Sequence, residues 1–331
     1  MQTDYKEKLD ELVDFGLSES SVVLFLGPEL IKFDGKDYNT AFYNSLPDDA
    51  GENVGKKKAK YNSDEKIWNF TSKSIQREFF FKFAKFFKKN RDINNPVFHK
   101  LASIPFPLIV SLIPDDTLKV AFSQYENFDF SFKSYLLDNE VPEPTPQNML
   151  IYNIYGNIRN REYVASHFDY LNFILEYAKN DFPMNFVSTI KKANYLIFVG
   201  FEFDKWYNIL LLYILNLIKS GSEKYAVEEQ SPEELYKKLS DSSLNMLFID
   251  KNADIFITDL YNKVKEYDLL RKIIPQKEYL MNLVKSNQEM IEKTKERLQV
   301  TTDPMETGKL KLDIENLETE NIEFINKLKN L

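Results

Sequence analysis

Short apolar runs that stop at a glycine constrain the fold of this chain most. VVLFLG (22–27) and YLIFVG (195–200) each place five apolar or aromatic residues in a row before the glycine. A run without alternating polar residues is typical of a strand that is covered on both faces, as in a parallel sheet between two layers of helices. The two runs therefore predict buried strands of one such sheet.

Further runs of the same kind alternate with helical patterns along the chain. Three more buried strands are expected at 104–112, 148–156 and 245–250, and helices at 64–90, 115–122, 169–179, 206–219 and 257–267. This alternation predicts an α/β fold with a mostly parallel, Rossmann-like sheet that is flanked by helices on both faces. Ligands of such sheets bind at the carboxyl ends of the strands, so we expect one rim formed by Gly27, Ile113, Tyr155 and Gly200.

Composition excludes several classes of function. The 331 residues carry a net charge of −8 with a pI near 5.2, which argues against nucleic-acid binding because phosphate neutralisation needs a basic surface. The chain has no cysteine, as expected in a reducing compartment, and only two histidines, so we expect no metal site. The charged amino terminus does not match a signal peptide, and the most apolar segment, 209–218, is too short to span a membrane. We therefore expect a cytoplasmic protein without a membrane partner.

The composition changes after Pro275, where two heptad-like series begin. The sequence TTDPME separates them, and its Asp303, Pro304 and Glu306 match an N-cap, a first helical position and a capping-box partner. The pattern predicts two domains: an α/β domain at 1–275 and an antiparallel helical hairpin at 276–331. The predicted seam consists of Leu280, Val284, Asn287, Ile291, Thr294 and Leu298 on one helix and Leu310, Ile314, Leu317, Asn321, Phe324, Leu328 and Leu331 on the other.

A turn at Pro304 fixes the register of this hairpin. Residues at equal distance from the proline should face each other, which pairs Leu298 with Leu310 and Asn287 with Asn321. The two amides could then satisfy each other's hydrogen bonds. Apolar residues outside the seam form a second stripe: Leu283, Met290, Leu312, Ile322 and Ile325. Two helices cannot cover that stripe, so we expect a protein partner or self-association through 276–331, and hence an oligomer, unless the hairpin folds back on the α/β domain.

Five segments in order resemble the sirtuin-like domains of bacterial antiphage defence systems. They are VVLFLGPEL, IPFPLIVSLIPDDTLKVAF, MLIYNIYGNI, HFDYLNFI and ANYLIFVGFEFDKWYNILLLYIL, which cover roughly residues 18–265. The C-terminal hairpin is similar to the effector-associated helical hairpins of bacterial defence and signalling proteins. The resemblance implies a sirtuin-like fold, and in active members of that family the domain cleaves NAD at its nicotinamide–ribose bond.

Three motifs carry NAD cleavage in that family, and this sequence departs from each. The Gly-Ala-Gly loop that holds the pyrophosphate is replaced by Gly27-Pro28-Glu29. The Asn-x-Asp motif keeps Asp115 but has Ile113 in place of the asparagine. The His-Gly motif keeps Gly156 but has Tyr155 in place of the histidine.

Elementary chemistry gives the same interpretation of the first motif. A pyrophosphate at a helix N-terminus is held by free backbone N–H groups and the positive end of the helix dipole. Pro28 has no N–H, and Glu29 places a carboxylate where the anion would lie. We therefore interpret Gly-Pro-Glu as a helix start that has lost its phosphate cradle. A vestigial pocket is expected at Gly27, Pro28, Glu29, Asp115, Gly156, Gly200 and Asp204.

Two functions remain open at this point. One is a catalytically silent sirtuin-like scaffold, sensor or regulatory subunit of a bacterial defence or signalling assembly, without a cofactor. The other is an active enzyme that cleaves NAD, or hydrolyses a derivative of it, with a rearranged set of catalytic residues: Asp115, Tyr155 and His167.

Overall fold

The computed structural model describes residues 5–49, 51, 53–126, 129–135, 140–160, 162–178, 182–218, 221–229, 233–240 and 244–329. Leu331 of the predicted seam lies outside these residues. The chain divides into two compact units. The first unit comprises Met1–Ala121 and Asp129–Arg271, and the second comprises Phe122–Phe128 and Lys272–Leu331. We describe each unit by itself.

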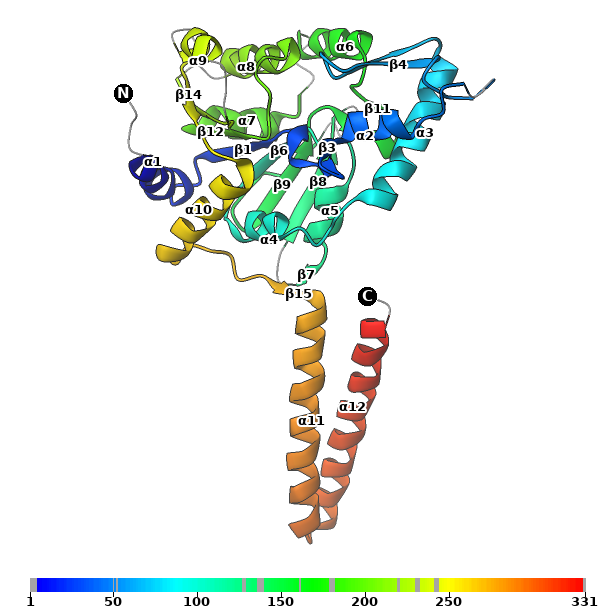
Figure 1. Cartoon of the computed structure of the whole chain (residues 1–331). Coiled ribbons are helices and arrows are strands. Elements are labelled where there is room, and N and C mark those ends of the chain that lie inside the picture. Colours follow the sequence, from blue (N-terminus) through cyan, green and yellow to red (C-terminus); the bar gives the residue numbers. More distant parts are fainter. Residues whose placement is uncertain are drawn as a thin grey trace. The chain divides into compact units, whose positions relative to one another are not determined.

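A sheet of seven parallel strands forms the centre of the first unit (Figure 1). Every neighbouring pair of strands is parallel. The order across the sheet is β14 (Met246–Ile249), β13 (Glu223–Val227), β12 (Tyr195–Val199), β1 (Val22–Leu26), β6 (Leu108–Ser111), β9 (Asn148–Asn153) and β8 (Asp129–Ser134). The predicted α/β class with a parallel sheet is confirmed. After β1 the chain first adds strands on the β6 side of the sheet and later on the β12 side, so the direction in which strands are added changes between β1 and β12.

The sequence patterns missed two strands of this sheet, β8 and β13. β8 reads DFSFKS, and β13 reads EKYAV. Both contain charged residues, including the fully buried Lys224, so neither shows the continuous apolar run that marks the other strands. Lys224 is accommodated because its Nζ donates to Asn216 Oδ1 (3.2 Å) and to the carbonyl oxygen of Ser222 (3.3 Å).

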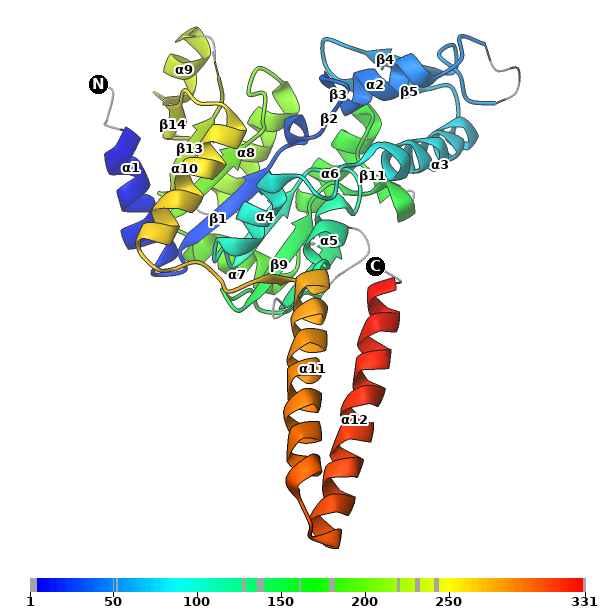
Figure 2. The ribbon, with the colours of Figure 1, turned by 60° about the horizontal axis from the view of Figure 1, so that its bottom comes forward.

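Helices cover both faces of the sheet. Alternate strand residues such as Val23, Phe25 and Phe198 share one apolar core with α6 (His167–Ala178), α7 (Met184–Lys192) and α8 (Trp206–Ile218). Figures 1 and 2 show α4 (Pro96–Ser103) and α10 (Ala253–Glu266) side by side across the other face, with α1 (Tyr5–Glu11) next to α10. Further helices are the π-helical turn at Leu12–Leu17, α5 (Thr117–Phe122) and α9 (Glu233–Ser240).

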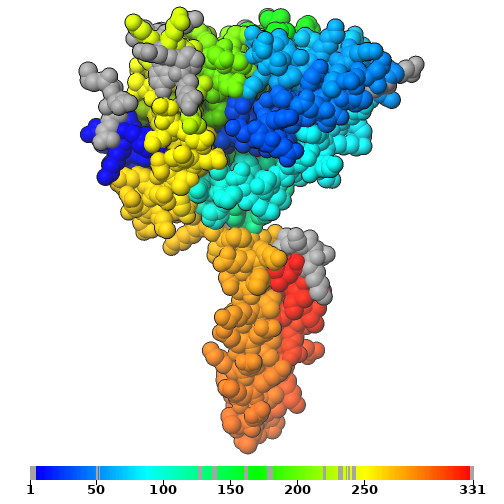
Figure 3. Space-filling model, viewed as in Figure 1, coloured from blue at the N-terminus to red at the C-terminus, as the bar shows by residue number. Residues whose placement is uncertain are grey.

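A lobe inserted between β1 and β6 has its own aromatic core. It contains the short strands β2 (Lys32–Phe33) and β3 (Lys36–Asp37), the helix α2 (Tyr38–Ser45), the hairpin of β4 (Ala59–Asn62) and β5 (Ile67–Phe70), and the helix α3 (Lys73–Asn90). In the space-filling view this lobe is blue to cyan (Figure 3). Phe42, Trp68 and Phe79 pack together with ring centroids 4.5–5.9 Å apart. A helix was predicted at 64–90, but the observed helix begins at Lys73. The prediction was wrong for the residues before it, because residues 67–70 form β5 and pair with β4.

The second unit contains the hairpin of α11 (Gln276–Val300) and α12 (Pro304–Lys329). The helices pack against each other along their length. Helix α11 ends before the predicted break and α12 begins at Pro304, where Asp303 Oδ1 accepts a hydrogen bond from the backbone N–H of Met305 (2.9 Å). Glu306 was expected to complete a capping box, but its carboxylate pairs with Arg297 across the turn (3.3 Å).

The seam of the hairpin follows the predicted positions. Its described members are buried or half-buried, and the fully buried ones are Leu280, Asn287, Ile291, Leu310, Ile314 and Asn321. The expected hydrogen bond between the two amides is not formed: Asn287 Nδ2 donates to Glu320 Oε2 (3.3 Å), and Asn321 Oδ1 is buried without a hydrogen bond to any described residue. In the predicted second stripe, Leu283 is half-buried. The other four residues are exposed: Met290, Leu312, Ile322 and Ile325.

Candidate functional site

The ends of four neighbouring strands form the predicted rim. Because β12, β1, β6 and β9 are adjacent in the sheet, Gly200, Gly27, Ile113 and Tyr155 follow neighbouring strand ends. The chain reverses its order across the sheet between β1 and β12, and a crevice for ligands is expected at such a point.

Backbone atoms close the crevice between β1 and β12. The N–H of Gly27 donates to the carbonyl oxygen of Val199 (2.8 Å), and the N–H of Glu29 donates to that of Gly200 (3.1 Å). A Cβ atom on Gly27 would lie 2.0 Å from the carbonyl oxygen of Gly200, so only glycine fits there. Gly200 itself has a φ of +78°, and a side chain on it would meet Leu30 Cγ at 2.7 Å. The N–H groups that could hold a phosphate are therefore bonded to the neighbouring loop.

The segment after Gly27 is a single 3₁₀ turn, Pro28–Leu30, which leads directly into β2. The predicted helix start was wrong, because three residues form no helix with a dipole that an anion or a carboxylate could use. Glu29 binds Lys66 instead, with an Oε1–Nζ distance of 2.5 Å, and Lys66 also binds Glu202 at 2.6 Å. One ammonium group thus holds two carboxylates at the rim.

Burial and charge act in opposite directions on the pKa values of Glu29 and Lys66. Burial raises the pKa of Glu29, although the charge of Lys66 opposes the shift. For Lys66 burial lowers the pKa, but the charges of Glu29 and Glu202 outweigh burial and place the pKa above its usual value. The cluster carries more negative than positive groups, so it does not favour a bound phosphate.

Only a small cavity of about 20 Å³ remains at this rim. That volume holds roughly one water molecule. Tyrosine rings fill most of the space: Tyr155 packs edge-on against Tyr170, with ring centroids 5.4 Å apart, and the hydroxyl groups of Tyr38 and Tyr163 lie 3.1 Å apart. The lining also includes Pro28, Glu29, Asn39, Lys66, Trp68, Leu112, Val164, Ala165, Tyr207 and Asn208.

Ile113 and Asp115 are buried at the end of β6. The backbone N–H of Ile113 donates to Ser111 Oγ (3.2 Å), and its carbonyl oxygen accepts from Asn153 Nδ2 (3.3 Å). Asp115 Oδ1 accepts a hydrogen bond from the backbone N–H of Thr117 (2.9 Å) at the start of α5. Asp115 Oδ2 makes no hydrogen bond to a described residue, and burial raises the pKa of this carboxyl group.

Asp116 has a different role from its neighbour. Its Oδ1 lies 2.8 Å from Arg91 Nη1 and its Oδ2 lies 2.7 Å from Arg159 Nη1. The same Arg91 atom is 3.8 Å from Asp115 Oδ2. Asp115 and Asp116 therefore point to different partners and do not form an acid–base pair.

The three candidates for a rearranged catalytic set lie in different environments. Tyr155 is buried, which raises the pKa of its hydroxyl group and makes it a poor base. His167 is exposed at the start of α6, and its ring is parallel to that of Trp206 at 6.0 Å. No described hydrogen bond joins any two of Asp115, Tyr155 and His167.

The remaining positions of the vestigial pocket have structural contacts. Gly156 has a φ of +82° and pairs with Tyr163 in a short antiparallel ladder, so it turns the chain after β9. Asp204 is exposed and binds Lys205 (2.7 Å).

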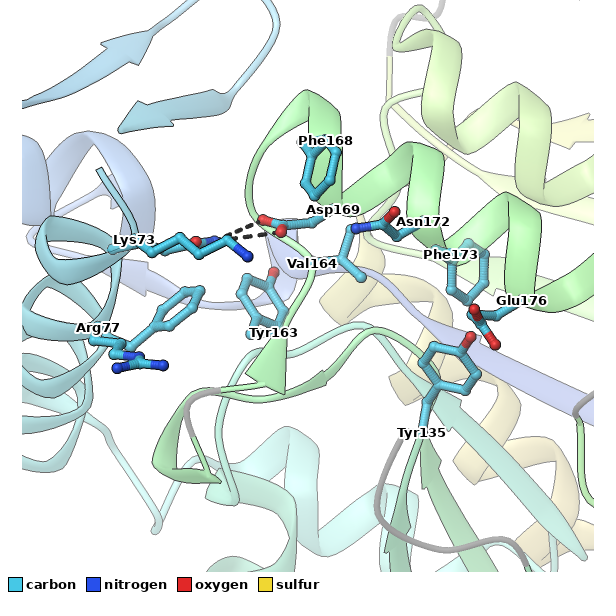
Figure 4. Close-up of a pocket in the computed structure, with 12 residues that line it drawn as sticks. Lys73, Arg77, Tyr135, Tyr163, Val164, Phe168, Asp169, Asn172, Phe173 and Glu176 are labelled. Atoms are coloured by element: carbon cyan, nitrogen blue, oxygen red, sulfur yellow. Dashed lines mark hydrogen bonds between the residues drawn. The ribbon is translucent and has the colours of Figure 1, made fainter. Parts of the chain in front are cut away.

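A larger cavity lies between α3 and α6, and the sequence patterns did not predict it (Figure 4). Its volume is about 320 Å³. Lys73, Gln76, Arg77 and Phe80 of α3 line one side, and the other lining residues are Tyr135, Tyr163, Val164, Phe168, Asp169, Asn172, Phe173 and Glu176. The only hint of this cavity in the sequence was that Lys73 and Arg77 are spaced to lie on the same face of one helix. That spacing does not indicate which helix lies opposite.

No protein-family model matches the sequence, and no curated protein matches it. Within the described residues, no group of three His, Asp or Glu side chains is placed to hold a metal ion. None of the helices in the described ranges combines the length and the hydropathy needed to cross a membrane.

Proposed function

We propose that this chain is a catalytically silent sirtuin-like module. It acts in the cytoplasm as a scaffold, sensor or regulatory subunit of a bacterial antiphage defence or signalling assembly, and it uses no cofactor. The observation that carries this proposal is the close approach of Gly27 to Gly200, where the backbone N–H groups of Gly27 and Glu29 are bonded to the carbonyl oxygens of Val199 and Gly200 and a cavity of about 20 Å³ remains. A dinucleotide needs a pocket of several hundred Å³.

The first test is incubation of the purified chain with NAD while nicotinamide release and bound nucleotide are measured. We expect neither release at catalytic rates nor tight binding. Nicotinamide release that Tyr155→Phe or His167→Ala abolishes would contradict the proposal and support the enzyme.

A restoration experiment separates the loop from the catalytic positions. The double variant Ile113→Asn/Tyr155→His restores two family residues but leaves Pro28, Glu29 and the closed backbone in place. We expect it to remain far slower than an active enzyme, because the pyrophosphate still has no free N–H donors. A fast NAD-cleaving double variant would show that the loop is not the obstacle.

The active enzyme remains the alternative, and one observation favours it. Asp115 is buried, has an oxygen without a described hydrogen bond, and has a raised pKa. Perturbed carboxyl groups of this kind are common at functional sites. NAD or a derivative would then be the substrate, with Asp115, Tyr155 and His167 completed by rearrangement or by a partner chain.

The hairpin is proposed as the surface that recruits a protein partner or a second copy. Leu312 and Ile322 on α12 have exposed fractions of 57% and 60%. Replacing both with glutamate should reduce the mass measured by light scattering at fixed protein concentration. Lys311→Glu, a change at another exposed position of the same helix, is the control and should leave the mass unchanged. An unchanged mass in both variants would contradict self-association.

A further inference from the structure

The cavity between α3 and α6 combines cationic, aromatic and amide side chains around one space. Its volume of about 320 Å³ lies at the lower end of the range for small-molecule sites. All its lining residues belong to the first unit. Figure 4 shows Lys73 and Arg77 on the α3 side, Asn172, Phe173 and Glu176 on the α6 side, and Tyr163 between them. We refer to this cavity as the α3–α6 groove.

Two cations on the α3 side are not paired with a carboxylate of any described residue. Lys73 and Arg77 are exposed, lie one turn apart, and form no ion pair with any described residue. The nearby carboxylate of Asp169 is already occupied. It accepts hydrogen bonds from the backbone N–H and the hydroxyl of Ser166 (2.9 and 2.7 Å) and from Gln76 Nε2 (3.1 Å). The two cations are therefore available to an anion from solution.

The body of the groove suits a planar ring. Phe80 and Phe173 are buried on its two sides, and Phe168 at its edge has an exposed fraction of 64%. An exposed phenylalanine beside a cavity offers a face on which a ring can stack. Asn172 is exposed on the same helix, and its amide can both donate and accept hydrogen bonds.

We propose that the α3–α6 groove binds a nucleoside monophosphate. The phosphate lies between Lys73 and Arg77, the base stacks on Phe168, and Asn172 contacts the polar edge of the base. A terminal phosphate carries a charge of about −1.5 to −2 at pH 7, which matches two cations better than a carboxylate or a phosphodiester does. Glu176 lies on the α6 side, away from the two cations.

Calorimetric titration of the full chain tests this assignment. The ligands are AMP, GMP, CMP and UMP, with adenosine, inorganic phosphate and NAD for comparison. At least one monophosphate should bind with a Kd of about 1 mM or tighter, and more tightly than all three comparison ligands. If no monophosphate binds in that range, or if adenosine, phosphate or NAD binds as tightly, the assignment is overturned.

Matched variants locate the binding. Arg77→Gln and Lys73→Gln should each weaken monophosphate binding roughly 10-fold or more, because each removes a charge-assisted hydrogen bond. Lys88→Gln, the same change at an exposed position near the other end of α3, should leave the Kd unchanged. Equal effects of Arg77→Gln and Lys88→Gln would overturn the site.

A second pair of variants tests the ring contact and separates this groove from the rim. Phe168→Ala should weaken monophosphate binding about 10-fold while inorganic phosphate binding stays as it was. Ile113→Asn/Tyr155→His should not affect monophosphate binding. Loss of binding in the Ile113/Tyr155 variant, together with full binding by Phe168→Ala, would place the ligand at the strand ends and overturn the proposal.

Discussion

The volumes of two cavities in the first unit are the reverse of what the fold predicts. The rim at the carboxyl ends of β1, β6, β9 and β12, where parallel α/β sheets bind ligands, has only about 20 Å³ of space. The α3–α6 groove, built by a lobe that the sheet does not require, has about 320 Å³. The comparison teaches that a fold marks where a site can form, whereas the loops and side chains decide whether space remains there.

The two cavities also differ in how their charges are used. At the rim, Lys66 lies within 2.6 Å of carboxylates from Glu29 and Glu202. In the groove, Lys73 and Arg77 form no ion pair with a described residue. Charges at the rim therefore stabilise the closed structure, whereas those in the groove are available to a ligand. Substitutions at the two cavities should differ accordingly in their effect on stability.

The largest effect is expected at the closed backbone contact. Gly27→Ala places a Cβ 2.0 Å from the carbonyl oxygen of Gly200, and neither backbone can move without separating β1 from β12. We expect a loss of about 3 kcal/mol or more in the free energy of unfolding, measured by urea denaturation. Gly308→Ala, where nothing lies within 4 Å, is the control and should stabilise its helix by roughly 0.5–1 kcal/mol. Equal stability of Gly27→Ala and the parent would mean that the rim is open.

Removal of the shared cation should have the next largest effect. Lys66→Met removes the cation that the partly buried carboxylates of Glu29 and Glu202 share, and leaves Glu202 only the more distant Lys205, at 3.8 Å. The expected loss is roughly 2–3 kcal/mol, below the value for fully buried pairs because all three groups retain some contact with solvent. Adding Glu29→Gln and Glu202→Gln to this variant should recover most of the loss. Lys57→Met, which breaks an exposed pair with Asp49, should change stability by less than about 1 kcal/mol.

Substitution of Asp115 should have a smaller effect on the free energy of unfolding, and this effect should depend on pH. Burial raises the pKa of its carboxyl group in the folded chain, so its contribution to stability is complete below the unfolded pKa and is lost as the pH rises through the folded pKa. Asp115→Asn cannot ionise and should be more stable than the parent at pH 7, by about 1–3 kcal/mol, with the gap narrowing toward pH 4. Denaturation curves at several pH values measure this gap.

Asp204→Asn, at an exposed carboxylate of the same rim, is the control for that experiment. Its stability should follow the parent's at every pH. A gap between Asp115→Asn and the parent that widens toward acid would show that Asp115 is stabilised in its charged form.

The smallest effect is expected in the α3–α6 groove. Phe168→Ala should change the free energy of unfolding by less than about 0.5 kcal/mol, because the side chain has an exposed fraction of 64%. Phe173→Ala, at a buried position of the same helix, should cost roughly 3–5 kcal/mol and serves as the matched control. A large loss in Phe168→Ala would indicate that the groove is part of the core and not a binding surface.

The fold was largely predictable from the sequence. The runs at 22–26 and 195–199 are long and apolar enough to identify their strands, and the two heptad series around Pro304 identified the hairpin and its seam. β13 was missed because its buried Lys224 interrupts the apolar pattern, and only its bonds to Asn216 and Ser222 make that burial tolerable. The residues expected at the rim do lie at adjacent strand ends. The carboxyl ends of parallel strands meet at the same edge of the sheet, and the four strands concerned are neighbours in it.

The sequence by itself determined that Pro28 has no N–H to offer and that Glu29 brings a carboxylate, since these are properties of the residues. Tertiary structure decided what those properties do. The helix expected at Pro28 is a single turn that leads into β2, the N–H of Glu29 donates to the carbonyl oxygen of Gly200, and the carboxylate of Glu29 faces Lys66. The groove between α3 and α6 likewise depends on segments distant in the chain. Local patterns reflect the periodicity of one element, whereas contacts such as Gly27–Gly200 and Lys66–Glu202 arise only when the folded sheet brings separate loops together.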